Sequence, residues 1–135
     1  MPTTYSNNNE RIFNNIQTVT DDITLTPADS GKLIFLNAAG GGDVTLPSLY
    51  AGANFKIMVG ATAPTTAWAV ISADVAKIQG VLTVAGLVVP AVDEDQINFI
   101  ASTALPGDFI VLECDGTNWY VTGVGNASGS ITATT

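Results

Sequence analysis

The residues with the most obvious chemical potential in this chain are acidic. Asp93, Glu94 and Asp95 form one short acidic run, and Asp21 and Asp22 form another. Carboxylate oxygens could hold Ca²⁺, and two carboxylates at a suitable separation could cleave a glycosidic bond. The spacing is not that of an EF-hand loop, which needs alternating acids, a glycine and a distant glutamate. Since any fold would bring some of the twelve acids together, we expect 93–95 to be a solvated loop, with no metal site and no catalytic residue.

Other catalytic arrangements lack an essential member. The chain has no histidine, which excludes histidine-based acid–base catalysis and histidine-ligated metal sites. The serines therefore have no histidine as a partner base, and the glycine run 40–42 is not followed by the Gly-Lys-Ser/Thr of a phosphate loop. A sugar-binding platform is a further hypothesis, although aromatic residues in β-sandwiches more often serve the core or an interface. Its candidate residues are Tyr50, Trp68, Trp119 and Tyr120. We expect a protein without enzyme activity or cofactor.

The composition favours a protein that works in an assembly. The 135 residues suit one domain, and 47% of them are hydrophobic whereas only 12% are charged. A typical soluble domain carries about 25% charged residues. A chain this poor in charge would expose large apolar patches as a monomer, and such patches usually mark contact surfaces. We therefore expect an obligate oligomer or a protein that lies on a larger assembly.

The charge pattern argues against nucleic acid and membranes as partners. The formal net charge is −8, and only four scattered cations, Arg11, Lys32, Lys56 and Lys77, are available to contact phosphates. The polar first fifteen residues do not resemble a signal peptide. The longest apolar run, 81–92, is interrupted and too short to span a bilayer. The single cysteine, Cys114, cannot form an internal disulfide, and we expect it to be buried.

The strongest structural signal is a β-hairpin at residues 107–125. Asp115-Gly116 lies between two runs of aromatic and β-branched residues, a pattern typical of hairpins. A two-residue loop would pair Leu112 with Trp119, and a four-residue loop would pair Cys114 with Trp119. Both registers place the same residues on one face, because a slip by an even count preserves the alternation of side chains. These predicted core residues are Ile110, Leu112, Cys114, Trp119 and Val121.

The opposite face of the hairpin is neither a clean core nor a clean solvent surface. It carries Phe109, Val111, Glu113, Asn118, Tyr120 and Thr122. Phe109, Val111 and Tyr120 make it too apolar for open solvent in a chain already short of charge. We therefore predict that these three residues contact a sister subunit or a second sheet.

The remainder of the chain predicts more strands. Strand-like runs recur roughly every 8–12 residues, with turn signals between them and no sustained helical period, which favours a sandwich or barrel. Residues 32–36 are apolar on both faces, which suggests a central buried strand. Connections at 26–31, 46–52 and 105–107 each place a proline, then a glycine, then a strand. Their unequal spacing indicates recurring turn chemistry and not a repeat array.

We divide the chain into an extended N-terminal arm at residues 1–15, a single β domain at 16–125 and a flexible or extended tail at 126–135. The arm is rich in asparagine, which disfavours regular structure. Its simplest interpretation is a frayed terminus, and the sharper hypothesis is an arm that orders against a neighbouring subunit. Its candidate contact residues are Tyr5, Arg11, Ile12 and Phe13.

Three segments resemble the small head decoration, or cement, proteins of tailed bacteriophages. They are Leu25-Thr26-Pro27-Ala28-Asp29-Ser30-Gly31-Lys32-Leu33-Ile34-Phe35-Leu36, continuing to Ala39; Val44-Thr45-Leu46-Pro47 with Ala51-Gly52-Ala53-Asn54-Phe55-Lys56; and Ile97-Asn98-Phe99-Ile100, Gly107-Asp108 and Asp115-Gly116-Thr117-Asn118-Trp119-Tyr120-Val121. Together they span most of residues 25–123. They are turn-and-strand signatures, and similar ones occur in phage tail-fibre and tailspike modules.

The resemblance implies a compact all-β unit that forms homotrimers on the outer capsid surface of the virion. Its partner would be the major capsid protein, which it would bind after head expansion, bridging capsomers and stabilising the shell. Because such proteins include jelly rolls and about eight to ten strands are expected here, the preferred fold is a jelly-roll-like antiparallel β-sandwich or barrel. The alternative is a receptor-binding, tail-fibre or spike module, with glycans as possible ligands.

Overall fold

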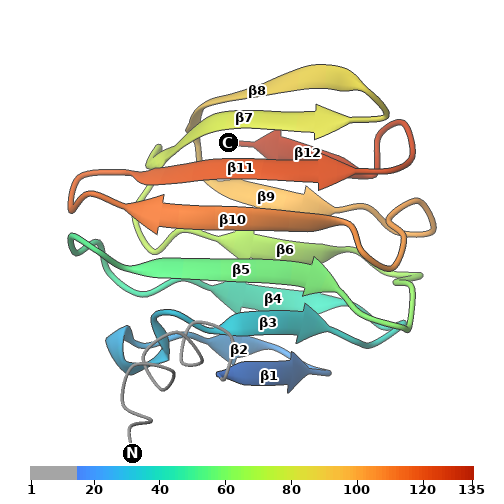
Figure 1. Ribbon diagram of the computed structural model, residues 1–135, viewed down its shortest axis with the longest axis horizontal. Helices are drawn as coiled ribbons and strands as arrows, with labels where there is room; N and C mark the ends of the chain where they lie inside the picture. Colours follow the sequence, from blue (N-terminus) through green and yellow to red (C-terminus); the bar gives the residue numbers. More distant parts are fainter. Residues whose placement is uncertain (1–14) are drawn as a thin grey trace, which may run out of the picture.

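The computed structural model describes residues 15–135 and shows an all-β sandwich of two packed sheets (Figure 1). We call the seven-stranded sheet, in front in Figure 1, sheet A, and the five-stranded sheet sheet B. In spatial order, sheet A contains β1 (Ile16–Val19), β3 (Leu33–Leu36), β5 (Asn54–Val59), β10 (Phe109–Cys114), β11 (Trp119–Gly125), β7 (Ile78–Val84) and β8 (Leu87–Glu94). Sheet B contains β12 (Ile131–Thr134), β9 (Gln96–Phe99), β6 (Trp68–Ile71), β4 (Gly42–Thr45) and β2 (Ile23–Thr24). One short 3-10 turn, η1 (Pro27–Asp29), connects β2 to β3.

One continuous core fills the space between the sheets. Strand residues alternate between buried and outward positions, as a half-buried sheet requires; the pattern is clearest in β5 and β11. The two tryptophans and two phenylalanines at its centre come from both sheets: Phe55 and Trp119 from sheet A, Trp68 and Phe99 from sheet B. All four are inaccessible to solvent or nearly so. The side chains that face away from this core are therefore the outer surfaces of the molecule.

The chain alternates between the sheets, and this alternation differs from the predicted jelly roll. β1, β3 and β5 pair in parallel in sheet A, and β2, β4 and β6 pair in parallel in sheet B. Each passage through both sheets is thus one coil, and three coils are stacked in the first half of the chain. A jelly roll is built from antiparallel Greek keys, whereas half of the ten ladders here are parallel. The all-β sandwich is confirmed, but the strand pairing is mixed.

The three similar connections are structurally equivalent. Those at 26–31, 46–52 and 105–107 all cross from sheet B to sheet A, joining β2 to β3, β4 to β5, and β9 to β10. The first two belong to successive coils. The prediction that they do not mark a repeat is therefore wrong for this pair. Ile16 pairs with Leu33, and Leu33 pairs with Lys56, so the coils differ in length, which hid the repeat.

The hairpin forms with the longer of the two predicted loops. Cys114 pairs with Trp119, and Leu112 pairs with Val121. All five residues predicted to face inward are buried, Cys114 among them. The turn is held by the Asp115 carboxylate, whose Oδ1 accepts hydrogen bonds from the backbone N–H groups of Thr117 and Asn118 at 2.8 and 2.9 Å. Two-residue loops are the commoner choice in hairpins, and the Asp115 side chain stabilises the four-residue loop found here.

The C-terminal residues belong to the sandwich and do not form a free tail. Residues 131–134 form β12, which pairs with β9 at the edge of sheet B, and Ile131 is buried in the core. The preceding loop is tied down by Asp108, a buried residue whose Oδ1 accepts a hydrogen bond from the Asn126 N–H at 3.0 Å. The sandwich therefore extends to the end of the chain. Within residues 15–135, no helix is long and apolar enough to cross a membrane.

Candidate interaction surface

The outward face of sheet A carries two rows of mostly apolar side chains that run across all seven strands. The register of the ladders aligns these rows. The first row is Thr18, Phe35, Met58, Phe109, Val124, Thr83 and Val88. The second row is Ile16, Leu33, Lys56, Val111, Thr122, Val81 and Pro90. We call these two rows the apolar face. Of its fourteen positions one is charged, Lys56, and three are threonine.

Much of the apolar face is accessible to solvent in the single chain. The exposed fractions of Ile16, Val81, Val124 and Val88 are 56%, 41%, 47% and 71%. The larger side chains Phe35, Met58 and Phe109 are half-buried, and the register aligns them on three neighbouring strands. A contiguous exposed apolar surface of this kind is unusual for a lone soluble protein and marks a contact site.

A third row of the same surface is polar. It consists of Asn54, Glu113, Tyr120 and Gln79, which the register aligns across β5, β10, β11 and β7. The Tyr120 hydroxyl donates to Asp115 Oδ2 at 3.1 Å, and the Gln79 side chain bonds Asp93. This polar row borders the apolar face on one side, at the end of the sheet where the hairpin turns.

The outward face of sheet B has the opposite character. Its two rows are Thr132, Asn98, Ala69 and Asp43, and Thr134, Gln96, Ile71, Thr45 and Thr24. Asn98 Nδ2 donates to Thr134 Oγ1 at 3.0 Å, and Gln96 Nε2 donates to Asn98 Oδ1 at 2.6 Å. Such side chains can face water without cost. The sandwich therefore has one apolar and one polar outer surface.

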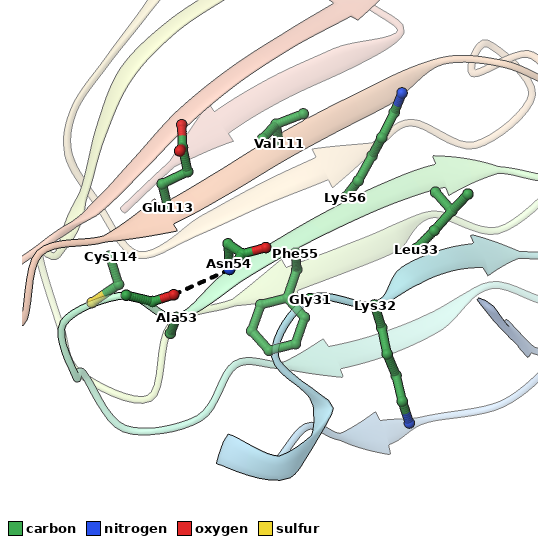
Figure 2. Close-up of a pocket in the computed structure, with 11 residues that line it drawn as sticks. Gly31, Lys32, Leu33, Ala53, Asn54, Phe55, Lys56, Val111, Glu113 and Cys114 are labelled. Carbon is green, nitrogen blue, oxygen red and sulfur yellow. Dashed lines mark hydrogen bonds between the residues drawn. The ribbon is translucent and has the colours of Figure 1, made fainter. Parts of the chain in front are cut away.

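A shallow hollow of about 350 Å³ opens between the polar row and the apolar face, where β3, β5 and β10 lie side by side (Figure 2). Figure 2 shows Lys56, Val111 and Glu113 projecting on one side, whereas Phe55 points the opposite way. The Lys56 ammonium lies 4.7 Å from the centre of the Phe109 ring, a favourable cation–π distance. Two lysines, Lys32 and Lys56, and one carboxylate, Glu113, line the hollow beside apolar side chains, and Lys32 is paired with Asp29.

Three of the seven predicted contact residues lie on this one surface. Phe109 and Val111 belong to the apolar face, and Tyr120 belongs to the polar row. The second sheet packs against the opposite side of the hairpin, so it does not cover these three residues. Their contact with a sister subunit stays a prediction. The remaining four, Tyr5, Arg11, Ile12 and Phe13, lie outside the described residues.

Outside the hairpin, the sequence indicated one further part of the apolar face, the strand β3. Residues 32–36 are apolar on both sides, and we predicted a central buried strand. β3 instead has only β1 beyond it, with Ile34 and Leu36 buried and Leu33 and Phe35 outward. The two-sided apolar pattern therefore reflects one side of β3 that packs in the core and one side that faces outward in the single chain.

The acidic runs do not assemble a metal site in the part of the chain that is described. No group of three or more Asp, Glu or Cys residues there could hold a metal ion. The prediction that residues 93–95 form a loop is wrong for the first two, because Asp93 and Glu94 are the last residues of β8. The Asp95 carboxylate accepts the Ala76 N–H, and its own N–H donates to the Thr134 carbonyl. These acids fasten loops to neighbouring strands.

Two aspartates have a lowered pKa because they accept hydrogen bonds in turns. The side-chain hydrogen bond from Lys32, followed by the Thr26 N–H, lowers the pKa of Asp29 below its ordinary value of 3.8. The backbone N–H groups of Asn118 and Thr117 lower the pKa of Asp115. Both groups belong to turns that position strands of sheet A, and Asp29 also forms an ion pair with Lys32.

We therefore expect stability to fall in acid. A carboxylate whose pKa is lowered on folding stabilises the folded state above its unfolded pKa, and this contribution is lost as the pH falls through the folded value. The free energy of unfolding, measured in urea, should thus decrease below about pH 4. Asp29→Asn should show a smaller decrease than the wild type, and Asp74→Asn, in an exposed loop, should not. An equal decrease in all three would contradict this assignment.

Comparisons with protein-family models, with curated proteins and with solved structures found no match to this chain.

Proposed function

We propose that the protein is a capsid decoration protein of a tailed bacteriophage. It binds the outer surface of the expanded head as a homotrimer and stabilises the shell. The observation that carries this proposal is the apolar face: an all-β sandwich with low charge and two outward apolar rows is suited to a permanent assembly. The segments that resemble decoration proteins build η1, β3, much of β5, parts of β4 and β9, and the hairpin turn with the start of β11; of these, β3, β5 and β11 belong to sheet A.

The remaining surface suits attachment to a shell. Apart from Glu113, the described acids lie off the outward rows of sheet A, on loops, strand ends and sheet B. An acidic surface keeps the protein soluble and complements neutral or basic patches on a major capsid protein. Residues 1–15, with Tyr5, Arg11, Ile12 and Phe13, supply a further contact to the shell or to a neighbouring subunit. Contacts of this kind require no catalytic group, metal or cofactor.

The proposal is tested by binding to purified heads that lack the protein. Expanded heads should retain it in saturable amounts during sedimentation, whereas unexpanded heads should not. Decorated heads should release their DNA at a higher temperature than bare heads. Binding should weaken as salt is raised, because part of the attraction is electrostatic. Failure of expanded heads to retain the protein at any ratio would refute the proposal.

A receptor-binding, tail-fibre or spike module is the second candidate. It is favoured by the stacked parallel coils of β1–β6, because stacked repeating units are the construction principle of elongated proteins. The exposed aromatic Tyr120 and half-buried Tyr50 could contact a glycan, whereas Trp68 and Trp119 are in the core. Binding of the isolated protein to host cells or to a glycan array would favour this candidate.

A further inference from the structure

We propose that the apolar face of sheet A is covered by sister copies of this chain and not by the capsid shell. The inference deepens the proposed function and rests on it for the number of copies, three. It assigns the subunit interface to one surface and leaves the polar outer surface of sheet B and the acidic loops free for solvent or the shell.

The layout of the surface is that of a protein–protein interface. Stable interfaces have an apolar centre, poor in charge, and a polar rim. Here the two apolar rows form the centre, and the row of Asn54, Glu113, Tyr120 and Gln79 forms a rim on one side. Phe109 and Val111 lie on the middle strand, β10, and Val124 lies on its neighbour β11, where an anchor would be most completely desolvated.

The surface is also close in size to one side of a standard interface. Seven strands spaced about 4.8 Å apart span about 29 Å, and a seven-residue strand such as β11 is about 23 Å long. The resulting footprint of roughly 600 to 700 Å² approaches the ~800 Å² that each partner contributes to a standard stable interface. Contacts from the strand ends and from the hollow would complete it.

The distribution of charge selects a second copy as the occupant. Each chain carries a net charge of −8, so two copies repel one another through most of their surfaces. The two apolar rows of sheet A are the exception, because their one charge is Lys56. The polar row beside them adds Glu113 and is bonded to Asp93 and Asp115 through Gln79 and Tyr120. A basic patch on a shell would find more carboxylates on the other surfaces.

Lys56 and Glu113 also give the face a self-complementary pair. Both border the hollow (Figure 2), and neither forms an ion pair within residues 15–135, where the only ion pair is Lys32–Asp29. A sister copy brings the same two charges, so its Glu113 can approach Lys56, and one of its side chains can enter the hollow. Opposite charges that meet in this way fix the register of subunits.

The first experiment measures the mass of the purified protein in solution by light scattering. The wild type should have about three times the 13.9 kDa of one chain. Val124→Glu places a carboxylate in the middle of the apolar face, at a position that is 47% exposed in the single chain. It should give the single-chain mass and keep the β-sheet circular dichroism of the wild type. Val75→Glu, the same change at a 77% exposed loop position, should remain a trimer.

The second experiment reverses the two charges. Lys56→Glu and Glu113→Lys should each raise the dissociation constant of the trimer by about tenfold, and the double variant should restore most of the affinity. Equal losses in the single and double variants would show that the two groups do not meet across the interface.

The outcomes separate this inference from the proposed function. A wild-type protein that is monomeric at all concentrations, or Val124→Glu that is still a trimer, overturns the inference. If the wild type is monomeric and binds heads, and Val124→Glu abolishes that binding, the apolar face belongs to the shell: the inference fails, and capsid decoration stands without the trimer. A trimer disrupted by Val124→Glu that binds no heads supports the inference and refutes the function.

Discussion

Replacing Trp119 by alanine is expected to lower the free energy of unfolding by about 3–5 kcal/mol, the usual cost of deleting a large buried aromatic side chain. Trp119 begins β11 and is completely buried. Its ring centre lies 5.9 Å from that of Phe55, within the range of favourable aromatic pairs. Its deletion would leave a cavity that the two rigid sheets cannot close.

The matched control for Trp119 is the next residue. Tyr120 lies on the opposite face of the same strand and is 44% exposed. Tyr120→Ala should cost less than about 1 kcal/mol when both changes are measured by urea unfolding in the monomeric Val124→Glu background, where subunit contacts do not contribute. A cost below about 1 kcal/mol for Trp119→Ala would show that the hairpin does not anchor the core as described.

Replacing Gly80 by alanine is expected to be comparably damaging, although it adds a single methyl group. A Cβ at Gly80 would lie 2.1 Å from the Val121 carbonyl oxygen, and the residue has φ +141°, where non-glycine residues are rare. The clash is with backbone, so β7 and β11 would have to move apart. Backbone strain of about 1–3 kcal/mol and overpacking of about 1–3 kcal/mol should combine to about 3 kcal/mol or more.

Gly86→Ala is the control for Gly80→Ala. Gly86 lies in the turn between β7 and β8 with φ +78°, and nothing lies within 4 Å of the position its Cβ would take. It should lose only the conformational contribution, about 1–2 kcal/mol. Both costs can be measured by urea unfolding. If the two variants unfolded with the same free energy, the close approach of β7 to β11 would be disproved.

The parts of the fold that depend on near neighbours could be predicted from the sequence. The inward residues of the hairpin, from Ile110 to Val121, follow from alternation across one turn, and the all-β class follows from the spacing of strands. The parallel coils could not be predicted in the same way. Their pairs, such as Ile16 with Leu33 and Ile23 with Val44, are joined by segments of different length that pass through the other sheet.

The candidate surface could be predicted only where its residues are close together along the chain. Phe109, Val111 and Tyr120 share one hairpin, so their common face was evident. Phe35 and Met58 join them through ladders between distant strands, and no local pattern shows which face of those strands is outward. Residues 32–36 showed only that both sides of β3 are apolar. In the structure one side packs in the core, and the other faces outward.

Electron cryo-microscopy of expanded heads incubated with the purified protein tests the central claim most directly. The account predicts additional density on the outer surface of the shell, in symmetric three-lobed units at stoichiometric positions, with the seven-stranded sheets turned toward one another. Heads that carry no such density, or density confined to the tail, would contradict it.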